Sequence, residues 1–216
     1  MRSPSHPSPS LMRRYRFFAP AVISLTLLAC NQTAEGNPAI SPQDAFMDNL
    51  RAHCEQAFPG RLVQAPEGDE MLEGSELLVV HFRECGEEEV KLPFHIESLD
   101  GSWDRSRTWV FTQHEGEIEL RHDHRLEDGS EDEVTWYGAF SDGEGTPNHQ
   151  EFLLPPDDRP TRGWRVEIEP GERYTYGTIR EGEWSWRVDF DLSESIDPPP
   201  PPWGHDTEPS RVPYPL

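Results

Sequence analysis

Basic residues are scarce in this sequence. Its 216 residues include 19 lysines and arginines against 41 aspartates and glutamates, which gives a formal net charge of −22 at pH 7. Four arginines fall within residues 1–29, where there is no acidic residue, so the chain from residue 30 onward carries 15 basic and 41 acidic residues, a net charge of −26. Such a surface repels nucleic acid and anionic lipid. We expect no nucleic-acid partner, and any membrane contact requires a covalent or hydrophobic anchor.

Familiar catalytic motifs are missing as well. The sequence contains no G-x-S-x-G nucleophile motif, no phosphate-binding loop and no C-x-x-C redox pair. No cofactor is expected, and no catalytic residue is specified by a motif. The composition therefore favours a binding protein over an enzyme without excluding the latter.

The apolar segment near the N-terminus is too short to cross a bilayer as a helix. It covers the 13 residues 17–29, whereas a spanning helix needs about 20, and it follows the basic stretch 13–16. This order is typical of a secretory signal. Its end, Leu27-Leu28-Ala29-Cys30, resembles the lipobox of bacterial lipoproteins, in which the cysteine is lipidated and becomes the first residue of the mature protein.

That resemblance implies a domain plan and a location. Residues 1–29 would be the signal peptide, 30–40 a tether lipidated on Cys30, 41–197 the folded domain and 198–216 a proline-rich tail. The acyl chains on Cys30 would anchor the protein stably in a membrane. In families with this signal, a residue other than Asp after the cysteine, here Asn31, implies the outer membrane. An exported protein with two further cysteines, Cys54 and Cys85, is expected to join them in a disulfide, with two buried free thiols as the alternative.

One amphipathic helix is expected at the start of the domain. Ser41 can cap it, Pro42 suits its first turn, and apolar residues then recur every four positions up to Phe58. This pattern predicts a helix over 42–57, with Pro59-Gly60 ending it.

After residue 60 the hydrophobic period changes to two, which indicates strands. Polar turns such as Glu115-Gly116, Asp128-Gly129 and Pro170-Gly171 separate them. We expect one face of strand 134–140 to carry Val134, Trp136, Gly138 and Phe140. In the last strand, 184–192, we expect Trp184 to be the first of the residues that point inward. The predicted strands are 61–66, 75–85, 90–96, 107–113, 118–125, 134–140, 150–154, 164–168, 173–179 and 184–192.

No helix separates these strands, so parallel βαβ units are excluded. Consecutive strands with short connections pair with their neighbours, and a long meander must close or split to protect its edges. We predict an all-β domain with one N-terminal helix: an antiparallel up-and-down meander that closes as a lipocalin-like barrel or a barrel-like sandwich, with the helix plugging one end. Pro93 suggests an edge or a bulge in its strand. A Greek-key sandwich is the alternative.

The candidate site lies in 104–125. Alternation over 118–125 places His122 and His124 on one face with Ile118 and Leu120, and Asp123 and Arg125 on the other. Three interpretations follow. Cross-strand pairing of arginines with Asp104 and Asp123 could order a polar face; the two imidazoles could share a metal with His81 or His95; or a polar pocket could bind a small anion or polar ligand. The pocket interpretation includes Trp136 and Tyr137, and the candidate ligand-binding residues are Arg105, Arg107, His122, Asp123, His124 and Arg125.

The same stretch carries a resemblance. Its blocks, residues 104–109 (DRSRTW), 121–125 (RHDHR) and 127–129 (EDG), resemble a group of uncharacterised bacterial secreted proteins. The likeness extends over most of 41–204, including Tyr137-Gly138 and Trp203-Gly204, and implies export without naming an activity. We therefore predict a cell-envelope lipoprotein that binds a small polar ligand or a protein partner. A hydrolase or isomerase centred on His122, Asp123 and His124, or a metal-binding protein, is the alternative.

Overall fold

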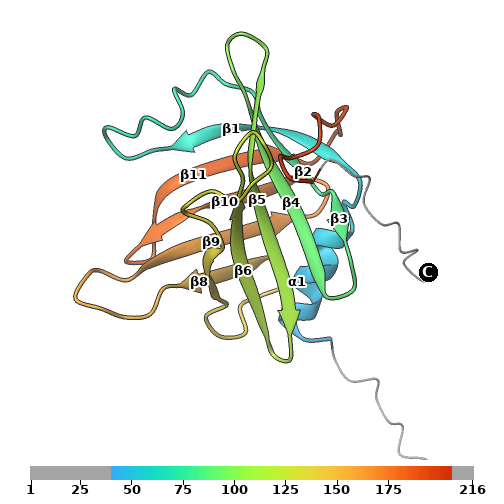
Figure 1. The fold of residues 1–216 in the computed structure, drawn as a ribbon. Coiled ribbons are helices and arrows are strands. Elements are labelled where there is room, and N and C mark those ends of the chain that lie inside the picture. The colour runs from blue at the N-terminus through green and yellow to red at the C-terminus, as the bar shows by residue number, and fades with distance from the viewer. Residues whose placement is uncertain (1–39, 206–216) are drawn as a thin grey trace, which may run out of the picture. The chain divides into compact units, whose positions relative to one another are not determined.

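The computed structural model describes residues 40–205, which form one α-helix and eleven strands (Figure 1). The expected signal peptide, the lipidated Cys30 and the tether up to residue 39 lie outside these residues. Helix α1 spans Pro42–Arg51. The strands are β1 (Ala57–Gln64), β2 (Leu78–His81), β3 (Glu84–Cys85), β4 (Glu89–Glu97), β5 (Trp103–His114), β6 (Glu117–His124), β7 (Tyr137–Phe140), β8 (His149–Leu153), β9 (Arg162–Glu169), β10 (Arg173–Arg180) and β11 (Glu183–Asp191).

The strands form a nearly closed barrel. Each strand pairs antiparallel with its neighbours in the order β7-β6-β5-β4-β2-β1-β11-β10-β9-β8, with β3 also paired to β4. Because the first strand pairs with the last, the up-and-down meander returns on itself, and the predicted all-β barrel with one helix is confirmed. The opening lies between β7 and β8. We call it the seam; one bridge between Ser141 and Phe152 and the hydrogen bond from the Asp142 N–H to the Glu151 carbonyl (2.7 Å) join its two sides.

The core fills the barrel because alternate residues of each strand point inward. Val90, Leu92, Phe94 and Ile96 of β4 are buried, as are Val166 and Ile168 of β9 and Val188 and Phe190 of β11, all as alternation predicted. Pro93 lies between the residues of β4 that pair with β2 and those that pair with β3, and a bulge follows it between Phe94 and Ile96.

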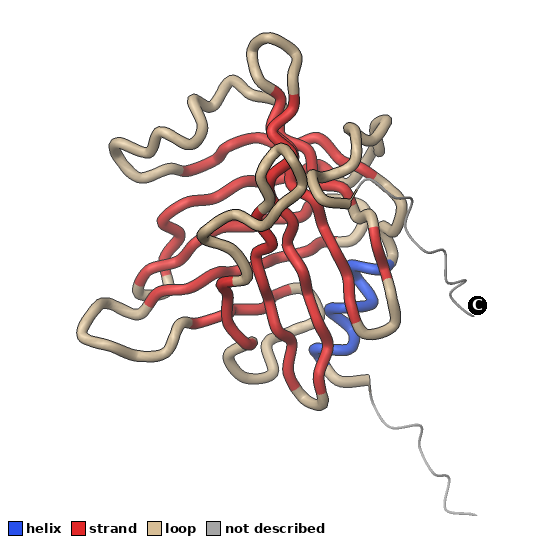
Figure 2. Tube along the Cα trace, viewed as in Figure 1, coloured by secondary structure: helices blue, strands red, loops and turns tan. Residues whose placement is uncertain are grey.

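Helix α1 closes one end of the barrel (Figure 2). The Ser41 hydroxyl accepts a hydrogen bond from the Asp44 N–H (3.0 Å), which confirms the predicted N-cap. The buried side chains of Phe46, Met47 and Leu50 face the barrel interior, and the Gln43 amide donates to backbone carbonyls in two of the turns at this end. Within residues 40–205, no helix is both long and apolar enough to pass through a bilayer.

The helix is shorter than predicted. It ends at Arg51 instead of residue 57, because turns follow and Glu55 adopts a left-handed backbone with φ of 65°. Cys54 then joins Cys85 of β3, so the predicted disulfide is confirmed, with 6.0 Å between the two Cα atoms. Phe58, expected at the helix end, belongs instead to β1 and is buried in the core.

Strand boundaries also differ from the prediction, and two of the differences have a clear local cause. Strand β1 begins at Ala57 rather than residue 61, so Pro59 and Gly60 lie inside a strand and do not end an element. A Cβ on Gly60 would sit 2.3 Å from the Phe190 ring, which shows why the position takes glycine. The predicted strand 75–85 divides into β2 and β3, because its register with β4 shifts by one residue between Val80, opposite Phe94, and Glu84, opposite Lys91.

One predicted strand is shorter than expected, and one facing prediction was wrong. The strand predicted over 134–140 is reduced to β7, so Val134 and Trp136 precede it. Within β7, Gly138 and Phe140 share the outer face, and Tyr137 and Ala139 face inward opposite His122 and Leu120 of β6. The left-handed backbone of Trp136 (φ 55°) changes the register of the expected alternation just before β7. In β11, a bulge pairs Trp186 with Thr178 but Trp184 with Ile179, which turns the Trp184 ring to the outer face beneath Arg165 and Arg187.

Candidate functional site

A pocket opens at the end of the barrel opposite α1. We call it the mouth pocket. Its volume is about 280 Å³, and it lies where seven barrel strands, β4 to β7 and β9 to β11, meet the loop between β1 and β2. Its lining residues are Pro66, Asp69, Met71, Phe94, Arg107, Trp109, His122, His124, Tyr137, Trp164, Tyr176, Thr178 and Trp186.

Aromatic rings form most of its wall. Trp109 stands between two of them, with its ring centroid 5.1 Å from that of Phe94 and 4.0 Å from that of Tyr176, both stacked. The Trp164 ring lies 4.9 Å from the His122 ring on another side. Such a wall offers a flat, polarisable surface on which a planar ligand can stack. The Tyr, Trp and His side chains also carry polar groups at the ring edge that can form hydrogen bonds.

His122 is a fixed part of this wall. Its Nδ1–H donates to the Tyr137 carbonyl (3.0 Å), which leaves Nε2 to accept from the Tyr176 hydroxyl. Burial lowers the pKa of His122 to about 4, because the charged imidazolium would lose its hydration. The ring is therefore neutral at pH 7, and both nitrogens are occupied by the protein, so His122 has no free position for a metal or for proton transfer.

A polar corner lies beside it. The His124 Nε2 and the Tyr137 hydroxyl share a hydrogen bond (3.1 Å), and Arg107, opposite His124 in the next strand, is held by Asp104 through Nη1 (2.8 Å). Burial and the charge of Arg107 lower the pKa of His124. Arg107 thus supplies the positive charge of the pocket wall, flanked by a neutral imidazole and a phenol.

The remaining candidate residues lie on the outer face of the barrel. The carboxylate of Asp123 is 1% exposed and accepts hydrogen bonds from Arg125 (2.7 Å) and His205 (2.9 Å). Arg105 donates to the Pro201 carbonyl (2.6 Å) and accepts through its own carbonyl from the Trp203 N–H (3.1 Å). The structure therefore brings Arg107, His122 and His124 together, and it places Arg105, Asp123 and Arg125 elsewhere.

These outer contacts hold the C-terminal segment 196–205 against the barrel. Besides Asp123 and Arg105, Arg83 binds it through a hydrogen bond from Nη2 to the His205 carbonyl (2.8 Å). The Ile196 N–H bonds the Ala57 carbonyl (2.8 Å) at the other end of the segment. The first part of the predicted tail, 198–205, thus packs on the domain. The arginines and aspartates do not pair across strands as expected: Arg107 binds Asp104 and Arg125 binds Asp123, each within its own stretch of chain.

Several pocket residues were not anticipated. Alternation shows that four of them point inward: Trp109, Trp164, Tyr176 and Trp186. It does not show that they meet at one pocket, because they come together only when the sheet closes into a barrel. Asp69, which accepts from the Trp186 indole N–H (3.2 Å), belongs to a loop that carries no pattern. Trp136, in contrast, is 41% exposed and bonds Glu131, outside the pocket.

The proposed metal site is not assembled. Alternation puts His81 and His95 on the opposite face of their strands from the inward Val80 and Phe94, away from His122. Residues 40–205 contain no group of three or more His, Cys, Asp or Glu side chains placed to hold an ion. Comparison with protein-family models and with curated protein sequences found no match for the chain.

Proposed function

We propose that this protein is an exported, lipid-anchored binding protein that takes up a small planar molecule with an acidic group in the mouth pocket. The observation that supports this most strongly is the composition of the pocket wall: stacked aromatic rings with one arginine, Arg107, at their edge. A barrel open at one end and closed by a helix at the other is a common place for such a site.

Size and charge narrow the class of ligand. Pockets for drug-sized ligands measure about 300–1,000 Å³, so a cavity of about 280 Å³ suits a compact molecule such as a substituted benzoate. Its ring would lie against Trp109, Tyr176 or Trp164, and its carboxylate would accept from Arg107, since a guanidinium binds carboxylates well. The neutral His124 and the Tyr137 hydroxyl would add hydrogen bonds at the same end.

A catalytic centre made of His122, Asp123 and His124 is less well supported. Asp123 lies on the outer face, bound to Arg125 and His205, and both ring nitrogens of His122 are occupied. Binding therefore explains the arrangement better than hydrolysis or isomerisation.

The test uses 4-hydroxybenzoate as the probe in isothermal titration calorimetry. Two analogues serve as matched controls: its methyl ester, which lacks the charge, and cyclohexanecarboxylate, which lacks the aromatic ring. We expect the acid to bind more tightly than either. Arg107→Gln should weaken binding of the acid about 10- to 100-fold, because a hydrogen bond to a charged group contributes about 1.5–3 kcal/mol.

Arg173→Gln, an exposed arginine at the closed end of the barrel, is the control and should leave the affinity unchanged. Equal affinity for acid and ester, or equal affinity of the two variants, would contradict the role of Arg107. Absence of heat for all three probes would contradict the ligand class.

Anchoring is tested separately. When the full chain is expressed in a bacterium that processes lipoproteins, we expect it in the membrane fraction. The Cys30→Ser variant should be found in the soluble fraction instead. Processing that is insensitive to the lipoprotein signal-peptidase inhibitor globomycin, or membrane partition that survives Cys30→Ser, would contradict the lipid anchor and leave the pocket proposal standing.

A further inference from the structure

One carboxylate in the wall of the mouth pocket has no cation beside it. Asp69, in the loop between β1 and β2, lines the pocket, and its Oδ2 accepts a hydrogen bond from the neutral indole N–H of Trp186 (3.2 Å). Among residues 40–205, no lysine, arginine or histidine forms an ion pair with this carboxylate. Arg107, the one arginine in the lining, is bound to Asp104 instead (2.8 Å). The negative charge of Asp69 is therefore left uncompensated.

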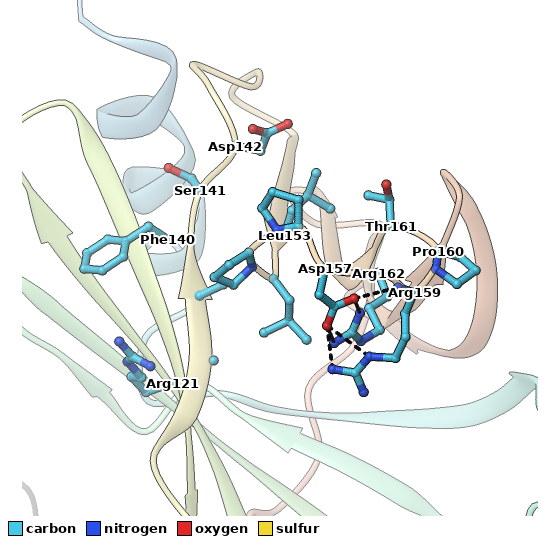
Figure 3. A pocket seen from close by; sticks show the side chains of 15 residues that line it. Arg121, Phe140, Ser141, Asp142, Leu153, Asp157, Arg159, Pro160, Thr161 and Arg162 are labelled. Carbon is cyan, nitrogen blue, oxygen red and sulfur yellow. Dashed lines mark hydrogen bonds and ion pairs between the residues drawn. The ribbon is translucent and has the colours of Figure 1, made fainter.

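The wider cleft at the seam differs in this respect. It measures about 670 Å³ and is lined by three arginines. Figure 3 shows the Asp157 carboxylate bound by Arg159 and Arg162, at 2.7 and 2.9 Å, and Arg121 is bound to Glu119 (2.6 Å). Every arginine of this cleft is thus already bound to a carboxylate, and none is left to select an anionic ligand.

The loop holds Asp69 in a fixed place. Leu72 inserts into the barrel core, where it is 5% exposed, and the Asp69 N–H bonds the Pro66 carbonyl (3.1 Å) across a turn in which Gly68 has φ of 83°. Residues 65–77 include five acidic and no basic side chains. No side chain within the loop can therefore neutralise Asp69, and its acidic neighbours add to the attraction for a cation.

Asp69 and Arg107 lie at two ends of the aromatic wall. The Trp186 ring beside Asp69 has its centroid 6.4 Å from that of Tyr176, and Tyr176 stacks at 4.0 Å on Trp109, two positions from Arg107 along β5. In the sheet order three strands separate β5 from β11, which carries Trp186. A planar ligand lying against the two stacked rings would have the guanidinium at one end and the carboxylate at the other.

We propose that the ligand of the mouth pocket is a zwitterion, a small planar molecule with its carboxylate at Arg107 and a protonated amine at Asp69 on the far side of the ring. This inference rests on the proposed function, because it extends the ligand assigned to the same pocket. Within the described chain, Arg107 uses Nη1 alone to bond Asp104 and Ser106, so its other N–H groups can bind the carboxylate. The amine would donate to Asp69 and contact the faces of the aromatic rings.

The test compares two para-substituted benzoates of similar size by isothermal titration calorimetry at pH 7. The first, 4-(aminomethyl)benzoate, carries the amine, and the second, 4-(hydroxymethyl)benzoate, carries a neutral hydroxyl at the same position. We expect the amine to bind about tenfold more tightly, an effect between that of an exposed ion pair and that of a buried charged hydrogen bond, because Asp69 is half-buried. The preference should shrink as salt is added, since salt screens partly exposed charges.

Variants assign the preference to Asp69. Asp69→Asn keeps a side-chain oxygen for the Trp186 indole, and in this variant the ratio of the two dissociation constants should fall from about tenfold toward equality. Asp69→Glu keeps the charge and should retain a preference for the amine. Glu70→Gln removes the same charge from the next position, which is exposed and outside the pocket lining, and should leave the ratio unchanged.

Several results would overturn the proposal. Equal affinity of the wild type for the two compounds would remove the role of the amine, and the proposed function would stand if Arg107→Gln still weakens both. A preference that survives in Asp69→Asn would place the amine elsewhere. An equal loss in Glu70→Gln would show the general field of the loop instead of a contact with Asp69. Absence of heat for both compounds would contradict this inference and the ligand class together.

Discussion

Acid should destabilise this protein through His122, and the size of the effect follows from its burial. The pKa of the buried imidazole is about 4, against 6.5 when exposed. Below pH 6.5 the unfolded chain therefore binds a proton that the folded chain does not, so stability is complete above that pH and falls as the pH drops. At about 1.4 kcal/mol per pKa unit, His122 should account for a loss of about 2–3 kcal/mol between pH 7 and pH 4.5.

The assay is urea unfolding of the wild type and of His122→Gln at several pH values across this range. The variant is less stable at pH 7, because it loses the hydrogen bonds to Tyr137 and Tyr176, but the difference should narrow by about 2–3 kcal/mol on acidification. An NMR midpoint near 6.5 for the His122 ring, or a difference that does not change with pH, would refute the reasoning.

Two further predictions concern covalent and polar ties. Replacing Cys54 and Cys85 together with serine should lower the free energy of unfolding by about 3–4 kcal/mol, because the disulfide closes a loop with a sequence separation of 31; a loss under about 1 kcal/mol in urea unfolding would contradict this. Asp123→Asn should weaken the contact with segment 196–205 and cost about 1–3 kcal/mol. Hydrogen exchange should then accelerate in that segment first; uniform acceleration across the barrel would indicate general destabilisation.

Much of the barrel could be predicted because its strands follow strict alternation. The later strands, β9 to β11, have inward aliphatic and aromatic residues at every second position, and Phe190 and Val166 are buried accordingly. The exceptions arise where backbone conformation overrides the pattern. Trp136 itself, and the residues Thr178, Ile179 and Trp184 at the bulge, are neither glycine nor proline, so alternation gives no warning at these positions. At Gly60 the pattern misleads in the opposite way. A glycine after a proline predicts the end of an element, but Gly60 lies inside β1, where the absence of a side chain makes room for the Phe190 ring.

The candidate site was predictable in part for the same reason. Alternation within β6 correctly separated His122 and His124 from Asp123, whose side chain lies on the outer face. It could not show that the His122 ring meets rings from β9 and β10, since those contacts depend on how the barrel curves. Segment 198–205 binds partly through backbone groups, such as the Pro201 carbonyl and the Trp203 N–H, which leave no mark on the sequence.

The pairing of β1 with β11 has a consequence for how the chain reaches this state. Gly60 lies opposite Phe190, 130 positions further along, so the ring cannot be completed before nearly the whole domain has been synthesised. Contacts this distant in sequence form slowly, since a long loop must close first. A chain cut before Glu183 would lose the neighbour of β1 and of β10 at once, leaving two more open edges. Ribosome-bound chains would therefore remain incomplete until β11 emerges.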